Sequence, residues 1–155
     1  MVTASIPGWG EIALEYLLVD FNGTVALDGQ IKTGVRELLE EAAKHLKVYV
    51  VTADTYESID KEAAGSFKIH KTGQVSSGID KAELVRQLGP EQVVAIGNGA
   101  NDAMMLREAA LGIAVLGEEG CAASALREAD VIVADITEGL AMLLDPKRLI
   151  ATLRE

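Results

Sequence analysis

The sequence is short of the residues that build cross-linked, zinc-binding or nucleic-acid-binding proteins. Its 155 residues contain one cysteine, Cys121, which excludes an intramolecular disulfide framework and a four-cysteine zinc site. Basic residues number 14 against 24 acidic ones, which gives a net charge of −10, and they form no basic stripe. Neither a nucleic-acid backbone nor an anionic membrane is therefore expected as the main partner.

Long apolar runs are also absent. The longest runs, such as those at 16–19 and 48–51, are far shorter than the roughly 20 residues that a membrane-spanning helix needs. The first 15 residues lack a basic start and carry Glu11 and Glu15 where the apolar core of a secretory signal would lie. These features predict a cytoplasmic protein.

The composition is that of a single globular domain. Hydrophobic residues make up 49% of the chain and charged residues 25%, and the length is close to the roughly 150 residues typical of one domain. No repeat, low-complexity linker or shift in composition marks a boundary. We therefore expect one domain over residues 1–155, with 1–15 as an N-terminal extension or edge strand and 146–155 as a C-terminal helix.

Short apolar runs alternate with segments of helical periodicity along the whole chain. The runs predicted to form strands lie at 16–19, 48–51, 67–70, 93–96, 111–115 and 131–133. The predicted helices begin near Thr33 and then cover 80–88, 102–109, 122–128 and 137–144, with Asp80 as the N-cap of its helix. A small hairpin is expected at 25–31.

This alternation predicts the fold class. Strands separated by helices indicate βαβ units, and apolar runs without alternation are typical of parallel strands that are covered on both faces. The predicted fold is α/β, a three-layer, Rossmann-like parallel sheet flanked by helices.

Polar side chains follow three of the predicted strands, at the edge where an open α/β sheet binds its ligands. Asp20 follows the first strand, Thr52 the second, and a glycine-rich segment with Asn98 and Asp102 the fourth. Lys81 lies in the first turn of a predicted helix. Each residue alone has a simple structural explanation, such as a turn, a helix cap or a solvated lysine. Their shared placement at one edge of the sheet favours a functional site.

These groups match what phosphoryl transfer requires. A carboxylate such as Asp20 can accept a phosphoryl group as a nucleophile, and two strand-end carboxylates can hold Mg²⁺, which prefers oxygen ligands. Thr52 and Lys81 can bind phosphoryl oxygens, and a glycine such as Gly23 lets backbone amides approach the anion.

Three segments also resemble a known family. DFNGT at 20–24, VVTAD at 50–54 and AIGNGANDAMML at 95–106, with a lysine between the last two, resemble the haloacid dehalogenase superfamily of phosphotransferases. They are most similar to the phosphorylation domain of P-type ATPases, with its motifs DKTGT, TGD and GDGxND, and to the small soluble relatives of that domain that lack a cap domain. The resemblance covers nearly the whole chain.

The resemblance implies a role for each matching residue. The nucleophile would be Asp20, the phosphate ligand Thr52 and the charge partner Lys81. Apart from the resemblance, Asp54 is expected to cap a helix or to support the site through another residue. The implied residues are Asp20, Asn22, Thr52 and Lys81 for catalysis, Gly23, Thr52, Ala53 and Lys81 for phosphate binding, and Asp20, the backbone carbonyl of Asn22, Asn98 and Asp102 for Mg²⁺. The implied activity is an Mg²⁺-dependent phosphomonoesterase that passes through phosphorylated Asp20.

Two positions depart from the family pattern. Asn22 stands where the phosphatases carry an aspartate that acts as general acid and base, and Asn98 stands where phosphatases and ATPases alike carry a metal-binding aspartate. Loss of the acid removes a contribution of about 10²–10⁴-fold to the rate, and fewer anionic ligands weaken the binding of Mg²⁺. The expected enzyme is slow, and a non-catalytic module that binds phosphate or a phosphorylated partner is the alternative.

The spacing of the motifs bears on the substrate. No inserted cap domain fits between residues 24 and 52 or between 52 and 81. An uncovered site suits a phosphorylated macromolecule as well as a small molecule, or it is completed by a second copy of the chain. A dinucleotide-binding domain is disfavoured because Asp102 stands where that motif has its third glycine.

Overall fold

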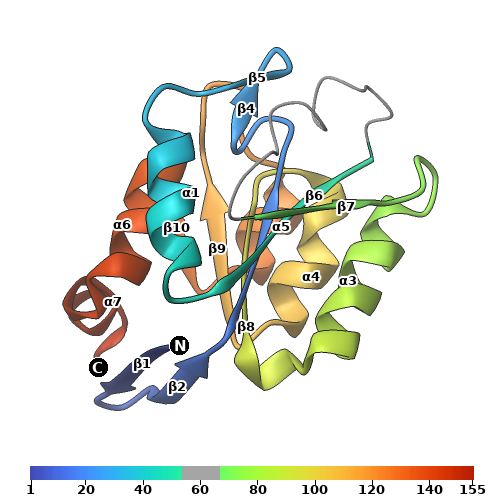
Figure 1. Ribbon diagram of the computed structural model, residues 1–155. Coiled ribbons are helices and arrows are strands. Elements are labelled where there is room, and N and C mark those ends of the chain that lie inside the picture. The colour runs from blue at the N-terminus through green and yellow to red at the C-terminus, as the bar shows by residue number, and fades with distance from the viewer. Residues whose placement is uncertain (54–66) are drawn as a thin grey trace.

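A parallel sheet forms the centre of the protein (Figure 1). The computed structural model describes residues 1–53 and 67–155, so the expectation for Asp54 lies outside the described residues. Six strands in these ranges pair in parallel, in the order β10-β9-β8-β3-β6-β7. Their bounds are Tyr16–Asp20 for β3, Lys47–Thr52 for β6, Lys68–Lys71 for β7, Val93–Gly97 for β8, Leu111–Val115 for β9 and Val131–Val133 for β10. The six apolar runs are thus confirmed as strands, each within one residue of its predicted ends.

The chain changes direction across the sheet beside β3. From β3 it builds β6 and β7 on one side, then crosses to build β8, β9 and β10 on the other. In open α/β sheets, the crevice at such a switch point is the place where ligands bind. The register pairs Asp20 with Val51 and Val19 with Ile96, so β3, β6 and β8 end at the same edge.

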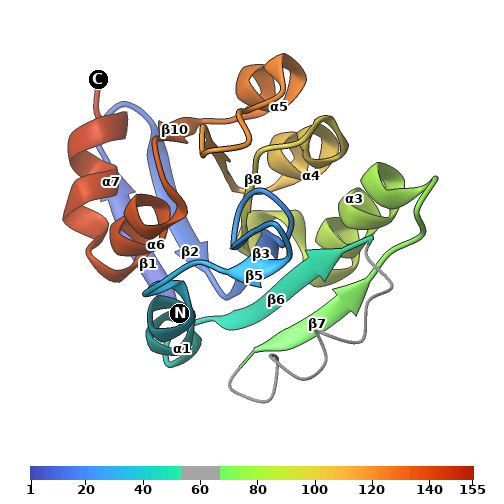
Figure 2. The same cartoon turned by 90° about the horizontal axis from the view of Figure 1, so that it is seen from above.

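Helices cover both faces of the sheet, as Figure 2 shows from above. One face carries α1 (Val35–Ala43), α6 (Ile136–Leu144) and α7 (Pro146–Leu153), and the other carries α3 (Ser77–Leu88), α4 (Ala103–Glu108) and α5 (Ala123–Glu128). The 3₁₀ turns η1 (Pro90–Gln92) and η2 (Ala100–Asp102) precede β8 and α4. This arrangement confirms the three-layer α/β class. No helix in the described ranges is long and apolar enough to cross a membrane.

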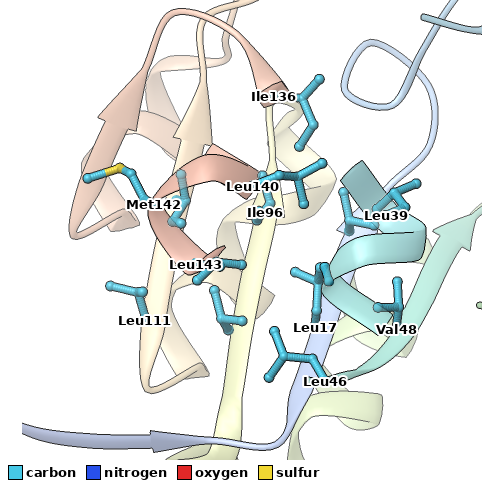
Figure 3. Packing of buried hydrophobic residues seen from close by; sticks show 14 of the residues in the cluster. Leu17, Leu39, Leu46, Val48, Ile96, Leu111, Ile136, Leu140, Met142 and Leu143 are labelled. Carbon is cyan, nitrogen blue, oxygen red and sulfur yellow. The ribbon is translucent and has the colours of Figure 1, made fainter. Parts of the chain in front are cut away.

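Successive residues of β3 pack into two separate cores. Leu17 and Val19 contact the helices on the face of α1 and α6, as Figure 3 shows for Leu17, whereas Leu18 packs with residues of α3 and α4. All three side chains are fully buried, and each such leucine or valine stabilises the fold by about 1.5–3 kcal/mol relative to an exposed one. Burial on both faces explains why these strands are continuously apolar.

Two hairpins lie outside the main sheet. The predicted hairpin at 25–31 is confirmed: β4 (Ala26–Leu27) and β5 (Gln30–Ile31) pair antiparallel around Asp28 and Gly29, which have φ of 50° and 78°. The first 15 residues form a separate antiparallel pair, β1 (Val2–Ile6) and β2 (Gly10–Leu14), rather than an edge strand of the main sheet. Buried side chains of this pair join the core on the side of α7.

The predicted start of α3 is wrong. Asp80 is not the N-cap, because α3 begins at Ser77 with Ser76 in that position. The Asp80 carboxylate accepts hydrogen bonds from Gly73 N at 2.8 Å and Ser76 Oγ at 2.9 Å, so it holds the preceding turn from inside the helix. The helix therefore starts one turn before the predicted residue, and Lys81 lies within it rather than at its beginning.

Candidate active site

Asp20 is the last residue of β3, the strand beside the switch point, and only 6% of it is exposed. The chain turns back directly after it, because Ala26 N donates to Phe21 O at 2.9 Å. This turn places the Thr24 hydroxyl 3.4 Å from Asp20 Oδ2 and 3.2 Å from Asn98 Oδ1. The residues after β3 and after β8 therefore meet at one point.

Lys81 lies between two carboxylates. Its ammonium donates to Asp20 Oδ1 and to Asp102 Oδ1, both at 2.6 Å, and its side chain is completely buried. One cation thus faces two buried carboxylates, which leaves one net negative charge when both are ionised. A buried ion pair of this kind is costly to form, because the charges lose their hydration.

Burial raises the pKa of Asp20 to about 7, and repulsion from Asp102 acts in the same direction, while Lys81 and the Thr24 hydroxyl lower it. The pKa of Lys81 is raised as well: burial lowers it, but the charges of Asp20 and Asp102 and their hydrogen bonds outweigh that effect. Lys81 is therefore a permanent cation at neutral pH, and Asp20 gains its charge near pH 7 when no metal is bound.

Asp102 is fixed from both sides. Its Oδ1 contacts Lys81, and its Oδ2 accepts hydrogen bonds from Asn98 N at 3.0 Å and Gly99 N at 2.8 Å. A β-carbon at Gly97 would lie 2.5 Å from the Asp102 carboxylate, so only glycine allows this close approach.

Asn98 uses both ends of its amide. Its Nδ2 donates to Gly120 O at 3.0 Å, while its Oδ1 lies next to the Thr24 hydroxyl. An ionised aspartate at this position could not donate to the Gly120 carbonyl. The departure from the family pattern at residue 98 thus has a structural consequence, since it ties the loop after β9 to the loop after β8.

The other predicted residues lie around this centre. Thr52 is buried at the end of β6, the strand that pairs with β3 beside Asp20, and its carbonyl accepts a hydrogen bond from Thr72 N at 2.9 Å. Ala53 follows it and is half-buried. Asn22 is exposed, and a single β-bridge joins it to Ala26.

Glu119 also reaches the site, although the sequence analysis did not identify it. A β-carbon placed on Gly23 would be 2.6 Å from Glu119 Oε2 and 2.6 Å from Asn98 Nδ2. Glu119 follows β9, so the rule that singled out the ends of the other strands would also have found it. The sequence did not single out Glu119, because two adjacent glutamates in a turn are typical of a solvent-exposed surface loop.

Comparison with known proteins assigns the family. The model of the haloacid dehalogenase-like hydrolases matches residues 2–110, and the chain therefore belongs to the haloacid dehalogenase-like hydrolase family. An uncharacterized protein of Methanocaldococcus jannaschii, MJ0073, is 38% identical over 97 residues, which are 63% of this chain and 98% of that protein. Membership of this family supports a phosphohydrolase.

Solved structures show the same fold. The 3-deoxy-D-manno-octulosonate 8-phosphate phosphatase of Moraxella catarrhalis, in complex with magnesium, phosphate and KDO, has a TM-score of 0.65 and 22% identity over 91% of this chain and 94% of its own. The cobalt-bound phosphatase of the same name from Haemophilus influenzae has a TM-score of 0.66 and 16% identity over 92% and 94%. The match to the family model, together with this shared fold, confirms the resemblance to the haloacid dehalogenase superfamily.

The donor set at this edge fits a divalent cation that prefers oxygen. Asp20 and Asp102 offer carboxylates and Asn98 an amide oxygen, and hard cations such as Mg²⁺ are held by oxygens of these types. In residues 1–53 and 67–155, no three His, Cys, Asp or Glu side chains come together as a ready metal cluster. Any cation here would thus depend on neutral oxygens as well as on the two aspartates.

Proposed function

We propose that this protein is an Mg²⁺-dependent phosphomonoesterase that forms a phosphorylated Asp20. The observation that carries the proposal is the buried contact of Lys81 with both Asp20 and Asp102 at 2.6 Å, at the switch point of the sheet. A hydrolase of this family needs a carboxylate nucleophile beside positive charge, and these residues supply both. Mg²⁺, when bound, would add Lewis-acid stabilisation of the phosphoryl oxygens.

The proposed binding step uses residues at or just after the ends of β3 and β6 and one residue of α3. Thr52 at the end of β6 and the amide of Ala53 donate to the phosphoryl oxygens, and Lys81 supplies a point charge. Gly23 donates its own amide to Ala26 O at 2.8 Å, and its left-handed φ of 78° lets the chain turn tightly beside the proposed phosphate site. Orientation of the anion by fixed donors stabilises the charge that develops during transfer.

The chemical step is an in-line displacement in two stages. A carboxylate oxygen of Asp20 attacks phosphorus, a P–O bond to Asp20 forms, and the ester P–O bond breaks with release of the alcohol, which takes a proton from water. A water molecule then attacks the phosphorus of phosphorylated Asp20, which releases inorganic phosphate and restores the carboxylate. Lys81 orients the Asp20 side chain through both stages, because its ammonium donates to Asp20 Oδ1 in the resting protein.

The proposed enzyme is slow at both stages. The side chain of Asn22 cannot give a proton to the leaving alcohol or take one from the attacking water, and such proton transfer is worth about 10²–10⁴-fold. Leaving groups that need little protonation, such as aryl alcohols, should therefore react best.

A binding module on the same fold is the second candidate. It is favoured by Asn98, whose amide bonds to Gly120 O and lies beside Thr24, because this arrangement stabilises the loops without adding charge for a metal. In this case the protein would hold phosphate or a phosphorylated partner without turnover.

The substrate is proposed only as a class. We propose that the protein has no cap domain, so that its site takes a phosphorylated small molecule or macromolecule, alone or with a second copy of the chain beside it. The soluble relatives of the P-type ATPase domain remain the proposed subgroup, and a cytoplasmic location remains a prediction.

Hydrolysis of 4-nitrophenyl phosphate with and without Mg²⁺ tests the proposal. We expect slow hydrolysis that requires Mg²⁺ and is abolished in Asp20→Asn. The matched control is Asp145→Asn, because Asp145 caps α7 and asparagine caps a helix equally well. Activity that persists in Asp20→Asn would refute the covalent mechanism. Binding of phosphate without any hydrolysis would favour the binding module.

A further inference from the structure

A tight turn after β9 packs against the loop that follows Asp20. Gly120 N donates to Gly117 O at 3.3 Å, so Glu118 and Glu119 occupy the middle of the turn. Gly117 has a left-handed φ of 57°, and a β-carbon there would lie 3.2 Å from Gly23 O. Glycine at 117 thus allows the turn to pack against the backbone of Gly23, next to the proposed active site.

The two glutamates of this turn have different neighbours. Glu118 forms an ion pair with Lys32 at 3.6 Å. Glu119 Oε2 and Asn98 Nδ2 both lie 2.6 Å from the position that a β-carbon of Gly23 would occupy. Glu119 therefore brings a carboxylate to the side chain that stands in place of the family's metal-binding aspartate.

We infer that Glu119 supplies the negative charge that Asn98 lacks, and that it helps to hold the divalent cation beside Asp20 through one water. This inference rests on the proposed function. With Glu119, the ionised groups are Asp20, Asp102, Glu119 and Lys81, whose net charge of −2 matches a divalent cation. Without Glu119 the charge is −1, and the cation is attracted less strongly.

Asparagine at 98 is compatible with a carboxylate at Glu119, and an aspartate at 98 is less so. We call the replacement of a carboxylate at 98 by one at 119 the carboxylate exchange. An aspartate at 98 would set a second carboxylate beside Glu119 and against the Gly120 carbonyl, which now accepts a hydrogen bond from Asn98 Nδ2 at 3.0 Å. The carboxylates of an aspartate at 98 and of Glu119 would repel each other. The amide of Asn98 instead donates to the Gly120 carbonyl and leaves Glu119 as the negative charge of this turn. The family pattern has this carboxylate in the loop after β8, and in this protein Glu119 supplies it from the loop after β9.

Calorimetric titration of Mg²⁺ into the full-length protein tests the inference without any need for turnover. We expect Glu119→Gln to weaken Mg²⁺ binding by about tenfold or more, the effect typical of groups that support a metal site. Glu118→Gln is the matched control, because it removes the same charge from the adjacent residue of the same turn, and we expect less than a twofold change. Thermal unfolding in EDTA checks that both variants fold.

A second substitution tests whether a carboxylate at 98 can replace the one at Glu119. Asn98→Asp should strengthen Mg²⁺ binding clearly in the Glu119→Gln background and much less in the wild type, so the two effects should not add. Equal affinities of Glu119→Gln and Glu118→Gln would overturn the inference and leave the proposed function standing. A wild type that binds no Mg²⁺ would overturn both.

Hydrolysis separates this role from general acid catalysis. At saturating Mg²⁺, we expect Glu119→Gln to hydrolyse alkyl and aryl phosphates in the same ratio as the wild type. A selective loss on alkyl phosphates, whose leaving groups need a proton, with unchanged Mg²⁺ affinity would instead assign Glu119 to proton transfer and overturn the inference.

Discussion

The Lys81 ammonium lies 2.6 Å from one carboxylate oxygen of Asp20 and 2.6 Å from one of Asp102. This contact joins α3 to the ends of β3 and η2, so one cation positions groups from three parts of the chain. Lys81 also reduces the repulsion between the two carboxylates, which share a buried site. The residue proposed to bind phosphate therefore also holds the metal-free protein together.

Replacement of Lys81 by methionine should destabilise the metal-free protein by about 3–5 kcal/mol, because it leaves two buried carboxylates without a cation. Added Mg²⁺ should recover part of this loss by replacing the missing positive charge. Urea unfolding in EDTA and in Mg²⁺ measures both effects. Lys44→Met is the control, since Lys44 is exposed and pairs only with Glu41 among the described residues, and its effect should be within about 1 kcal/mol. A Lys81→Met protein as stable as this control would contradict the account.

The raised pKa of Asp20 predicts how stability depends on pH. Between pH 4 and 7 the unfolded chain releases the Asp20 proton, while the folded metal-free protein keeps it until about pH 7. The free energy of unfolding of the wild type, relative to that of Asp20→Asn, should therefore fall as pH rises through this window, by at most about 1.4 kcal/mol per pH unit. Above pH 7 the difference should stay constant.

Asp80→Asn provides the matching control for this pH series. Hydrogen bonds from Gly73 N and Ser76 lower the pKa of the Asp80 carboxyl, so this group is ionised in both the folded and the unfolded state above about pH 5. The difference in the free energy of unfolding between Asp80→Asn and the wild type should be flat from about pH 5 to 7. A flat difference for Asp20→Asn as well would show that the Asp20 carboxyl is not perturbed.

Asn22→Asp should raise the rate of hydrolysis of alkyl phosphates by about 10²-fold or more, because it restores a proton donor for the leaving group. The gain on aryl phosphates should be smaller. The ratio of kcat values on the two ester classes measures this selectivity. Asn101→Asp adds the same charge in η2, where Asn101 contacts Ser77, and should not change the ratio. An equal gain on both ester classes would argue against a role in proton transfer.

Gly23 and Gly29 offer a matched pair, since both have φ of 78°. Alanine at either position should cost about 1–2 kcal/mol of stability for the left-handed backbone. A β-carbon at Gly29 meets no atom within 4 Å, whereas one at Gly23 displaces Asn98 and Glu119. Gly23→Ala should therefore weaken Mg²⁺ binding at least tenfold while Gly29→Ala leaves it unchanged, as titration calorimetry would show. Equal Mg²⁺ affinities of the two variants would mean that these side chains play no part in metal binding.

The fold followed from the sequence where local patterns are strong. Apolar runs without alternation correctly indicated buried parallel strands, and Asp28-Gly29 indicated the hairpin turn that the structure contains. The start of α3 was wrong because a carboxylate that holds the preceding turn, as Asp80 does, produces the same pattern as an N-cap. Strand-end residues could be selected, because parallel strands bring their ends to one edge.

Other features of the candidate site depend on distances that no local pattern contains. The simultaneous contact of Lys81 with Asp20 and Asp102 requires α3 to pack against η2. The approach of Glu119 to Asn98 requires Gly23 and Gly117 to bring two loops together. Such pairs, 21 or more residues apart in the chain, become visible only when the tertiary structure is known.

Trapping of the acyl phosphate tests the central claim most directly. Borohydride reduces a phosphorylated aspartate to homoserine, and slow attack by water, expected with Asn22 in place of an acid, lets the intermediate accumulate. Wild-type protein quenched with borohydride during turnover of an aryl phosphate in Mg²⁺ should contain homoserine at position 20 and at no other aspartate, as peptide mass spectrometry would show. Sustained hydrolysis with an unmodified Asp20, or with homoserine at a different position, would contradict the proposed mechanism.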